Sequence, residues 1–146
     1  MEIRKPTAVE LETIRKLSPQ AMNEGTLGSV FPTDEKVKQM VEPLLEKGGY
    51  YLAAIDDQGN VAGWILIGPS KDSFTDSVVG YIYELYVCAE YRRRGISKKL
   101  MQSGIEQLKE AGYDEIRLNV FVENHAIHLY RQLGFTERNM TMSLKS

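Results

Sequence analysis

The sequence contains little cysteine and little histidine. Its 146 residues include one cysteine, Cys88, and two histidines, His125 and His128. A single cysteine cannot form an intramolecular disulfide, which is typical of a reducing compartment. The two histidines stand three positions apart without a cluster of further ligands, so we predict no metal site.

Long apolar runs are also absent. The longest, such as Val61–Ile67, is far too short to span a bilayer. Charged residues interrupt the N-terminal stretch where a signal peptide would have its apolar centre. We therefore expect a cytoplasmic protein that does not bind membranes.

Charge of one sign is not in excess either. Eighteen basic and 20 acidic side chains leave a formal net charge of −2, which disfavours a general nucleic-acid-binding protein. Apolar residues make up 42% and charged residues 26% of the chain, the usual profile of a globular protein. The length predicts one domain over residues 1–146.

The first half of the chain predicts two helices and a hairpin. After a short strand at Glu2–Lys5, the capping-box pattern from Thr7 starts a helix that we expect to end at Ser18-Pro19, before an irregular segment. Thr33 or Asp34 can cap a second helix, which contains Pro43 and stops at Gly48-Gly49. The turn-forming residues 56–60 separate two strands, which we place at Tyr50–Ile55 and Val61–Gly68.

The second half alternates strands and helices. A surface loop is expected at Pro69–Ser77 and a long strand at Val78–Val87, followed by an amphipathic helix from Ile96 to Ala111. Glu115–Val122 predicts another strand and Asn124–Leu133 a last helix. A final strand is predicted at Thr136–Leu144. The order is β-α-α-β-β-β-α-β-α-β, an α/β fold with a mixed sheet.

The turn between the long strand and the amphipathic helix has the residues of an anion site. Arg92-Arg93-Arg94-Gly95 lies where the first N–H groups of a new helix have no partner. These groups and the positive end of the helix dipole attract phosphate, arginines add charge, and glycine lets the main chain approach the ligand. A charged surface turn is the plainer interpretation. Neither a P-loop nor a Rossmann glycine pattern is present.

Two segments resemble the GNAT acetyltransferase superfamily. Arg92-Arg93-Arg94-Gly95-Ile96-Ser97 is similar to its Arg/Gln-x-x-Gly-x-Gly/Ala signature, with Ser97 in the last place. Asn124-His-Ala-Ile-His-Leu-Tyr130, followed by Gly134-Phe135, is similar to the family pattern Asn-x-x-Ala-x-x-Leu-Tyr-x-x-x-Gly-Phe, with an Asn-to-Tyr interval one residue shorter. The resemblance implies a mostly antiparallel GNAT sheet flanked by helices.

The resemblance also implies acetyl-CoA as co-substrate. Its pyrophosphate would lie on the signature turn, and its pantetheine arm would pair with the long strand where that strand parts from the next one. Asn124 would contact the pantetheine or the adenosine side. The cofactor-binding residues implied are Leu85, Tyr86, Val87, Arg92, Arg93, Arg94, Gly95, Ile96, Ser97, Lys98 and Asn124.

Two residues are candidates for proton transfer. Tyr130 matches the family tyrosine and would protonate the leaving thiolate; a core aromatic residue is the alternative interpretation. Glu84 is the only charged residue in its strand, so it is either a general base or anchor for a cationic substrate, or a strand residue that reaches solvent. Asn119 occupies a position where some members carry a glutamate base, which leaves Glu84 or relayed water for that role.

The reaction implied is direct acetyl transfer from the thioester to a primary amine of a small molecule or peptide. A non-catalytic GNAT-like module that binds CoA as a sensor or scaffold is the alternative. The identity of the amine is not readable from the sequence, and neither is the oligomeric state, with which a homodimer is compatible.

Overall fold

A computed structural model describes all 146 residues, and a five-stranded sheet forms its centre. The strand order is β1-β2-β3-β4-β5, with antiparallel neighbours except for the parallel pair β4 and β5. The strands are β1 (Glu2–Arg4), β2 (Tyr50–Ile55), β3 (Val61–Lys71), β4 (Val78–Val87) and β5 (Ile116–Leu118). This arrangement confirms the predicted fold class, a mixed and mostly antiparallel α/β sheet.

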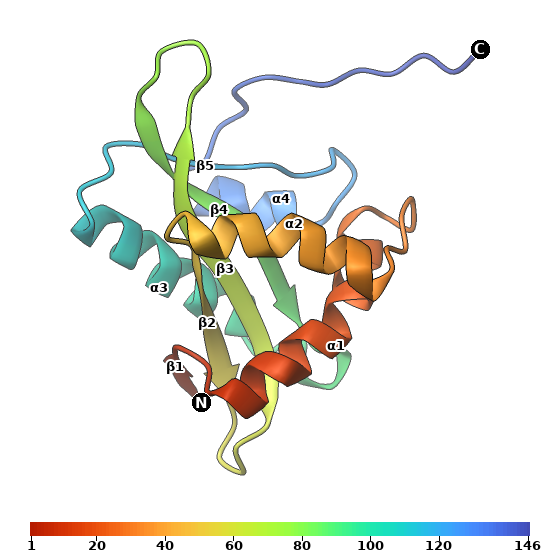
Figure 1. Cartoon of the computed structure of the whole chain (residues 1–146), viewed down its shortest axis with the longest axis vertical. Coiled ribbons are helices and arrows are strands. Elements are labelled where there is room, and N and C mark those ends of the chain that lie inside the picture. Colours follow the sequence, from red (N-terminus) through yellow and green to blue (C-terminus); the bar gives the residue numbers. More distant parts are fainter.

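Helices cover both faces of the sheet (Figure 1). The helices are α1 (Ala8–Gly25), α2 (Asp34–Glu46), α3 (Ile96–Glu110) and α4 (Ala126–Gln132). Helices α1 and α2 lie in front of the strands in Figure 1, whereas α3 and α4 lie behind them. No helix combines the length and the apolar character that a membrane crossing requires.

Alternation along the strands divides the apolar core into two parts. Ile65, Ile67 and Ile82 pack with Leu100 and Met101 on the α3 side. On the α1 side the core consists of Ile14, Ala21, Tyr51, Ala53, Ile55, Trp64, Leu66 and Cys88. Each face of the sheet is therefore buried by its own layer of helices.

Helix α1 is longer than the sequence predicts. The capping box at Thr7 and Glu10 is present, but the helix continues through Pro19 to Gly25 instead of ending at Ser18-Pro19. The Ser18 hydroxyl donates to the Ile14 carbonyl at 2.7 Å. Pro19 and Ala21 are buried, so packing against the sheet outweighs the lost helix hydrogen bond at proline.

Three further elements differ from expectation. Strand β3 runs through Pro69 to Lys71, which shortens the predicted loop to residues 72–77. Strand β5 covers only Ile116–Leu118 of the predicted Glu115–Val122. The final strand predicted at Thr136–Leu144 does not form, because no strand lies beside these residues and the tail runs away from the body (Figure 1).

Strand β4 contains a bulge next to the predicted site. Leu66 pairs with Glu84 and Ile67 with Ile82, so Tyr83 is an extra residue on β4. A bulge bends a strand and increases its twist. It therefore redirects the second half of β4, which carries the predicted cofactor-binding residues.

Gly63 allows β3 to approach this second half of β4. A Cβ atom at Gly63 would lie 2.5 Å from the Tyr86 carbonyl oxygen, which is main chain and cannot rotate away. At Gly25 an added Cβ would meet nothing within 4 Å. A side chain therefore cannot be accommodated at position 63, whereas one can be accommodated at position 25.

We therefore predict that Gly63→Ala lowers the free energy of unfolding by ~1–3 kcal/mol, the usual cost of overpacking. Gly25→Ala is the matched control and should leave stability unchanged or slightly higher. Urea denaturation followed by circular dichroism measures both. Equal stability of the two variants would contradict the close packing of β3 on β4.

Candidate active site

The site begins where β4 separates from β5. The two strands pair only at Gly80–Ile82, and after Leu118 the chain leaves the sheet. The Cys88 N–H donates toward β3, to the Ala62 carbonyl. Because main-chain groups alternate along a strand, those of Leu85 and Val87 point to the opposite, open side.

The turn after β4 has an unusual backbone. A short 3-10 turn at Ala89–Tyr91 leads into it, and both Arg93 (φ 65°) and Gly95 (φ 76°) are left-handed. Glycine adopts this conformation at little cost, whereas arginine rarely does. Left-handed residues in a turn direct successive N–H groups into one concavity, an arrangement that binds anions.

The N–H groups of this turn have no partner in the protein. From Arg93 through Lys98, no main-chain N–H donates a hydrogen bond, and the α3 pattern begins with Lys99 bonding to the Gly95 carbonyl at 3.2 Å. These groups lie at the positive end of the α3 dipole. The arrangement fits a ligand that brings several acceptor oxygens.

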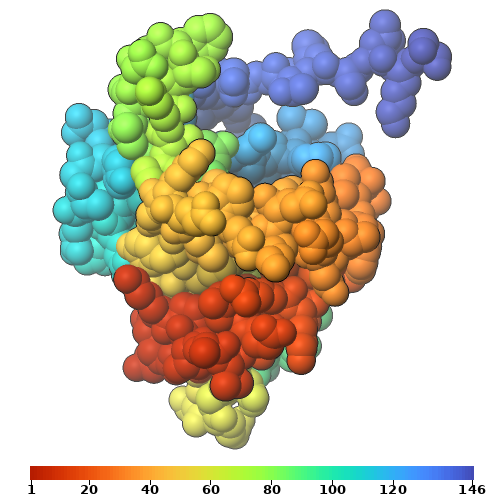
Figure 2. All heavy atoms as spheres, in the orientation of Figure 1, coloured from red at the N-terminus to blue at the C-terminus, as the bar shows by residue number.

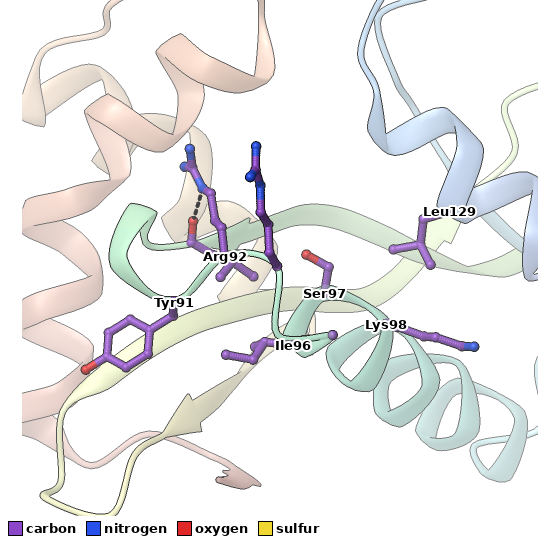
Figure 3. Close-up of a pocket in the computed structure, with 9 residues that line it drawn as sticks. Tyr91, Arg92, Ile96, Ser97, Lys98 and Leu129 are labelled. Carbon is purple, nitrogen blue, oxygen red and sulfur yellow. Dashed lines mark hydrogen bonds between the residues drawn. The ribbon is translucent and has the colours of Figure 1, made fainter.

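A pocket of about 300 Å³ opens at this turn (Figure 3). Seven of the predicted cofactor-binding residues line it, namely Val87, Arg92, Arg93, Gly95, Ile96, Ser97 and Lys98. Tyr91 and Leu129 also line it, although the sequence did not single them out. Leu129 lies on α4. It directly precedes Tyr130 in the second motif, and this position was the only sign in the sequence that it lies near the site.

Arg92 holds the turn in place. Its Nε donates to the Val87 carbonyl at 2.9 Å, the contact drawn in Figure 3, and its terminal nitrogen lies 2.6 Å from a Glu24 carboxylate oxygen. The guanidinium also stacks 5.5 Å from the Tyr86 ring centroid. Arg92 therefore links the end of β4 to the end of α1, and it also lines the pocket.

Glu24 is a site residue that sequence reasoning missed. It receives hydrogen bonds from Gln20, Tyr86 and Arg92, and no pattern connects it to residues more than sixty positions away. Desolvation raises the Glu24 pKa, but these three donors outweigh it and leave the pKa below its usual value. Burial and the Glu24 carboxylate together raise the pKa of Tyr86 to about 12.

The other predicted cofactor contacts lie around the pocket. Leu85 packs on the α3-side core, whereas Tyr86 pairs with Trp64 on β3. Arg94 turns toward the Tyr91 ring, at 5.5 Å from its centroid. The Asn124 side chain accepts from the Ala126 N–H at 2.9 Å and donates to the Gly25 carbonyl at 3.4 Å, so it joins the start of α4 to the end of α1.

Glu84 is desolvated on the α1 face of the sheet. Leu66 on β3 is the residue paired with Glu84, and the Trp64 indole N–H donates to the Glu84 carboxylate. Burial raises the Glu84 pKa to about 7, although the indole hydrogen bond acts in the opposite direction. A carboxyl group with this pKa can accept or release a proton near neutral pH.

Tyr130 lies on the other face of the sheet. It packs against the α3-side core, with its ring centroid 6.2 Å from that of Phe135. Burial raises the pKa of its hydroxyl. The structure thus places Glu84 and Tyr130 on opposite sides of the sheet, and neither lines the pocket at the turn.

Trp64, the only tryptophan, reports on the ionisation of Glu84. We expect its fluorescence to change with a midpoint near pH 7, because the carboxylate that accepts from the indole has a pKa of about 7. Glu84→Gln should abolish this titration. A midpoint near the ordinary glutamate value, or an unchanged titration in the variant, would contradict it.

The same ionisation has a defined effect on stability. The folded-state pKa lies above the ordinary value, so the folded protein binds more protons than the unfolded chain between these two values. The contribution of Glu84 to the free energy of unfolding is therefore fully present below about pH 4.5 and is lost as the pH rises through 7. The Glu84→Gln variant should lack that loss, which is up to ~3 kcal/mol.

Comparison with known proteins gives consistent matches. A protein 26% identical over 151 residues is described as the uncharacterised N-acetyltransferase YdgE of Bacillus subtilis, with 93% of this chain and 92% of that protein covered. A structure described as a putative acetyltransferase from Pyrococcus furiosus has a TM-score of 0.83 and 25% identity, covering 99% of both chains. The aminoglycoside N-acetyltransferase AAC(6')-Iy, solved in complex with CoA, has the same fold, with a TM-score of 0.76, 21% identity and coverage of 99% and 93%.

A family profile matches most of the chain. It is described as the acetyltransferase (GNAT) family and aligns with residues 17–135, which include α2, α3, α4, strands β2 to β5 and the second half of α1. The aligned region contains the open end of β4, the turn from Arg92 to Lys98 and Tyr130 on α4. This chain belongs to the GNAT acetyltransferase family.

Proposed function

We propose that residues 1–146 act as one N-acetyltransferase domain that moves an acetyl group from acetyl-CoA to a primary amine. The observation that carries the proposal is the row of unpartnered N–H groups at the start of α3, adjacent to the open side of β4. A diphosphate would supply acceptors for the N–H groups, and an amide-containing arm attached to it would supply hydrogen-bond partners for the open side of β4. The lone, buried Cys88 is compatible with the cytoplasmic location expected from the sequence.

The turn supplies the diphosphate site. The N–H groups from Arg93 to Lys98 donate to the phosphate oxygens, and the exposed Arg93 and Lys98 side chains contribute positive charge. Arg92 is not free for this task, because Glu24 and the Val87 carbonyl hold its guanidinium. Its role is to keep the turn in its binding conformation.

The open side of β4 supplies the site for the pantetheine arm. The Leu85 N–H and carbonyl pair with amides of the arm as a neighbouring strand would. The Val87 carbonyl already accepts from Arg92, so only the Val87 N–H remains on this side. This N–H is the donor that stabilises the oxyanion of the tetrahedral intermediate.

The reaction transfers one acetyl group without a covalent enzyme intermediate. The amine loses a proton to Glu84, directly or through water, as its nitrogen attacks the thioester carbonyl. The C–N bond forms, the C–S bond then breaks, and the Tyr130 hydroxyl protonates the leaving thiolate. The two residues lie on opposite faces of the sheet, which lets a base act on the amine while an acid acts on sulfur.

The proposed function makes a prediction about cofactor binding. Gly95 and Gly112 both have positive φ (76° and 97°) and neither would bring an added Cβ within 4 Å of another atom. Alanine strains both positions, but only Gly95 lies in the turn between β4 and α3. We expect Gly95→Ala to weaken CoA binding by ~10-fold or more, about 1.4 kcal/mol, and Gly112→Ala to leave it unchanged.

Isothermal titration calorimetry with CoA measures both variants. A free protein that does not bind CoA, or two variants that bind it equally well, would overturn the assignment of the turn. Thermal melts of the two variants measure how much stability each substitution costs, so that a loss of CoA binding can be separated from a loss of folding.

The proposed function also makes a prediction about the pH dependence of acetyl transfer. In an assay of CoA release with a panel of polyamines, aminoglycosides and N-terminal peptides, kcat/KM should rise with pH and level off above about 7, the Glu84 pKa. Glu84→Gln should remove this limb and lower kcat by ~10²–10⁴-fold, the usual contribution of a general base. Tyr130→Phe should lower kcat with little change in CoA affinity.

The panel separates the two functional hypotheses. Turnover of at least one amine supports the enzyme, and the preferred amine then identifies the substrate class. Tight CoA binding without turnover of any amine, together with no effect of either substitution, would instead indicate a CoA-binding sensor or scaffold.

A further inference from the structure

The turn between β4 and α3 is attached to the body of the protein at two successive residues. Arg93 has a left-handed backbone (φ 65°), which a residue with a side chain keeps only where neighbouring contacts hold it. Arg92 supplies one attachment, through the Val87 carbonyl and Glu24. Tyr91, the residue before it, supplies the other.

Tyr91 connects the turn to the hairpin between β2 and β3. Its hydroxyl donates to an Asp56 carboxylate oxygen at 2.6 Å, and its ring packs against both parts of the apolar core. Tyr91 also lines the pocket at the turn, whereas in Figure 3 its hydroxyl points away from the other labelled side chains. The hydroxyl therefore serves the contact with Asp56 and not the pocket.

Asp56 is a fixed acceptor for this hydroxyl. The tip of the β2–β3 hairpin, yellow in Figure 2, projects from the body below α1. The Asp56 carboxylate closes this tip, because it accepts from the N–H groups of Gln58 and Asn60 at 3.0 and 2.8 Å. The hydrogen bond from Tyr91, followed by those from the hairpin, holds the pKa of Asp56 below its ordinary value. The carboxylate is therefore ionised at neutral pH and accepts all three bonds.

We propose that Asp56 is a positioning residue for the N–H groups from Arg93 to Lys98 and acts on them through the Tyr91 hydroxyl. Without this hydrogen bond Arg93 is free to relax toward ordinary backbone angles, and the N–H groups that follow no longer converge on one ligand. Asp56 itself does not line the pocket at the turn, and it lies outside both sequence motifs. The inference rests on the proposed function, because it concerns how tightly acetyl-CoA binds.

The Tyr91→Phe variant tests this role, because it removes the hydroxyl and keeps the ring. Calorimetry should show a CoA dissociation constant raised by ~3–10-fold, the usual effect of losing one hydrogen bond. The KM for acetyl-CoA should rise by a similar factor. The kcat and the KM for the amine should not change, because the substitution leaves Glu84 and Tyr130 in place.

Variants of the hairpin identify the acceptor. Asp56→Ala should weaken CoA binding as Tyr91→Phe does, and combining the two should cause no further loss, because both remove the same bond. Asp56→Asn keeps an oxygen that can accept from the hydroxyl, so it should restore most of the affinity. Asp57→Ala is the matched control in the same hairpin and should bind CoA like the unchanged chain. Tyr91→Phe leaves the bonds within the hairpin intact, so its result stands even if Asp56→Ala unfolds the tip.

Two-dimensional NMR of the CoA-free protein gives a readout that does not require the proposed function. The Gly95 amide resonance should shift or broaden in Tyr91→Phe and Asp56→Ala, whereas that of Gly112 should stay in place. Asp57→Ala should move neither resonance. If the unchanged chain fails to bind CoA, the proposed function fails, and the Gly95 resonance alone then decides whether Asp56 positions the turn.

The role of Asp56 is refuted by any of three results. The first is a Tyr91→Phe chain with an unchanged Gly95 resonance, or one that binds CoA as tightly as the unchanged chain. The second is an additive loss of CoA affinity in the double variant. The third is an equal loss in Asp56→Ala and Asp57→Ala.

Discussion

The separation of β4 from β5 is the constraint on which the candidate site depends. Pairing stops at Ile82, and the bulge at Tyr83 redirects the strand just beyond that point. Main-chain groups in a protein interior are expensive to leave without partners. Here the open side of Leu85 and Val87 continues into the unpartnered N–H groups of the turn, so one ligand can satisfy both.

The turn keeps its shape through contacts that a ligand does not provide. Arg92 connects the Val87 carbonyl with Glu24 at the end of α1, and Asn124 connects α4 with Gly25. The ends of α1, β4 and α4 are thereby held together around the pocket. A partly exposed ion pair such as Arg92–Glu24 adds little stability by itself, so we interpret its main effect as positional.

The two faces of the sheet give different environments to the two candidate proton-transfer groups. Glu84 lies between Trp64 and Leu66 on the α1 side, and burial there raises its pKa to about 7. Tyr130 lies in the α3-side core, where burial raises the pKa of its hydroxyl and keeps it protonated at neutral pH. Because neither group has an ion-pair partner, desolvation dominates both shifts.

The sequence by itself determined the local elements and the turn. Capping residues, the period of the apolar residues and the strand–Arg-Arg-Arg-Gly–helix run are short-range signals, and the predicted helices, most strands and seven pocket residues followed from them. It also determined the family, since the two motifs lie within the matched region. Propensity failed at Pro19, where burial of α1 against the sheet outweighed the helix-breaking tendency of proline.

Only the tertiary structure decided what depends on distant residues. The contact of Glu24 with Arg92, the short β5, the raised pKa of Glu84 and the placement of Tyr130 on the opposite face all arise from segments far apart in the chain. The tail shows the same limit. Its alternating pattern predicts a strand, but a strand forms only where another strand supplies hydrogen-bond partners, and none lies beside it.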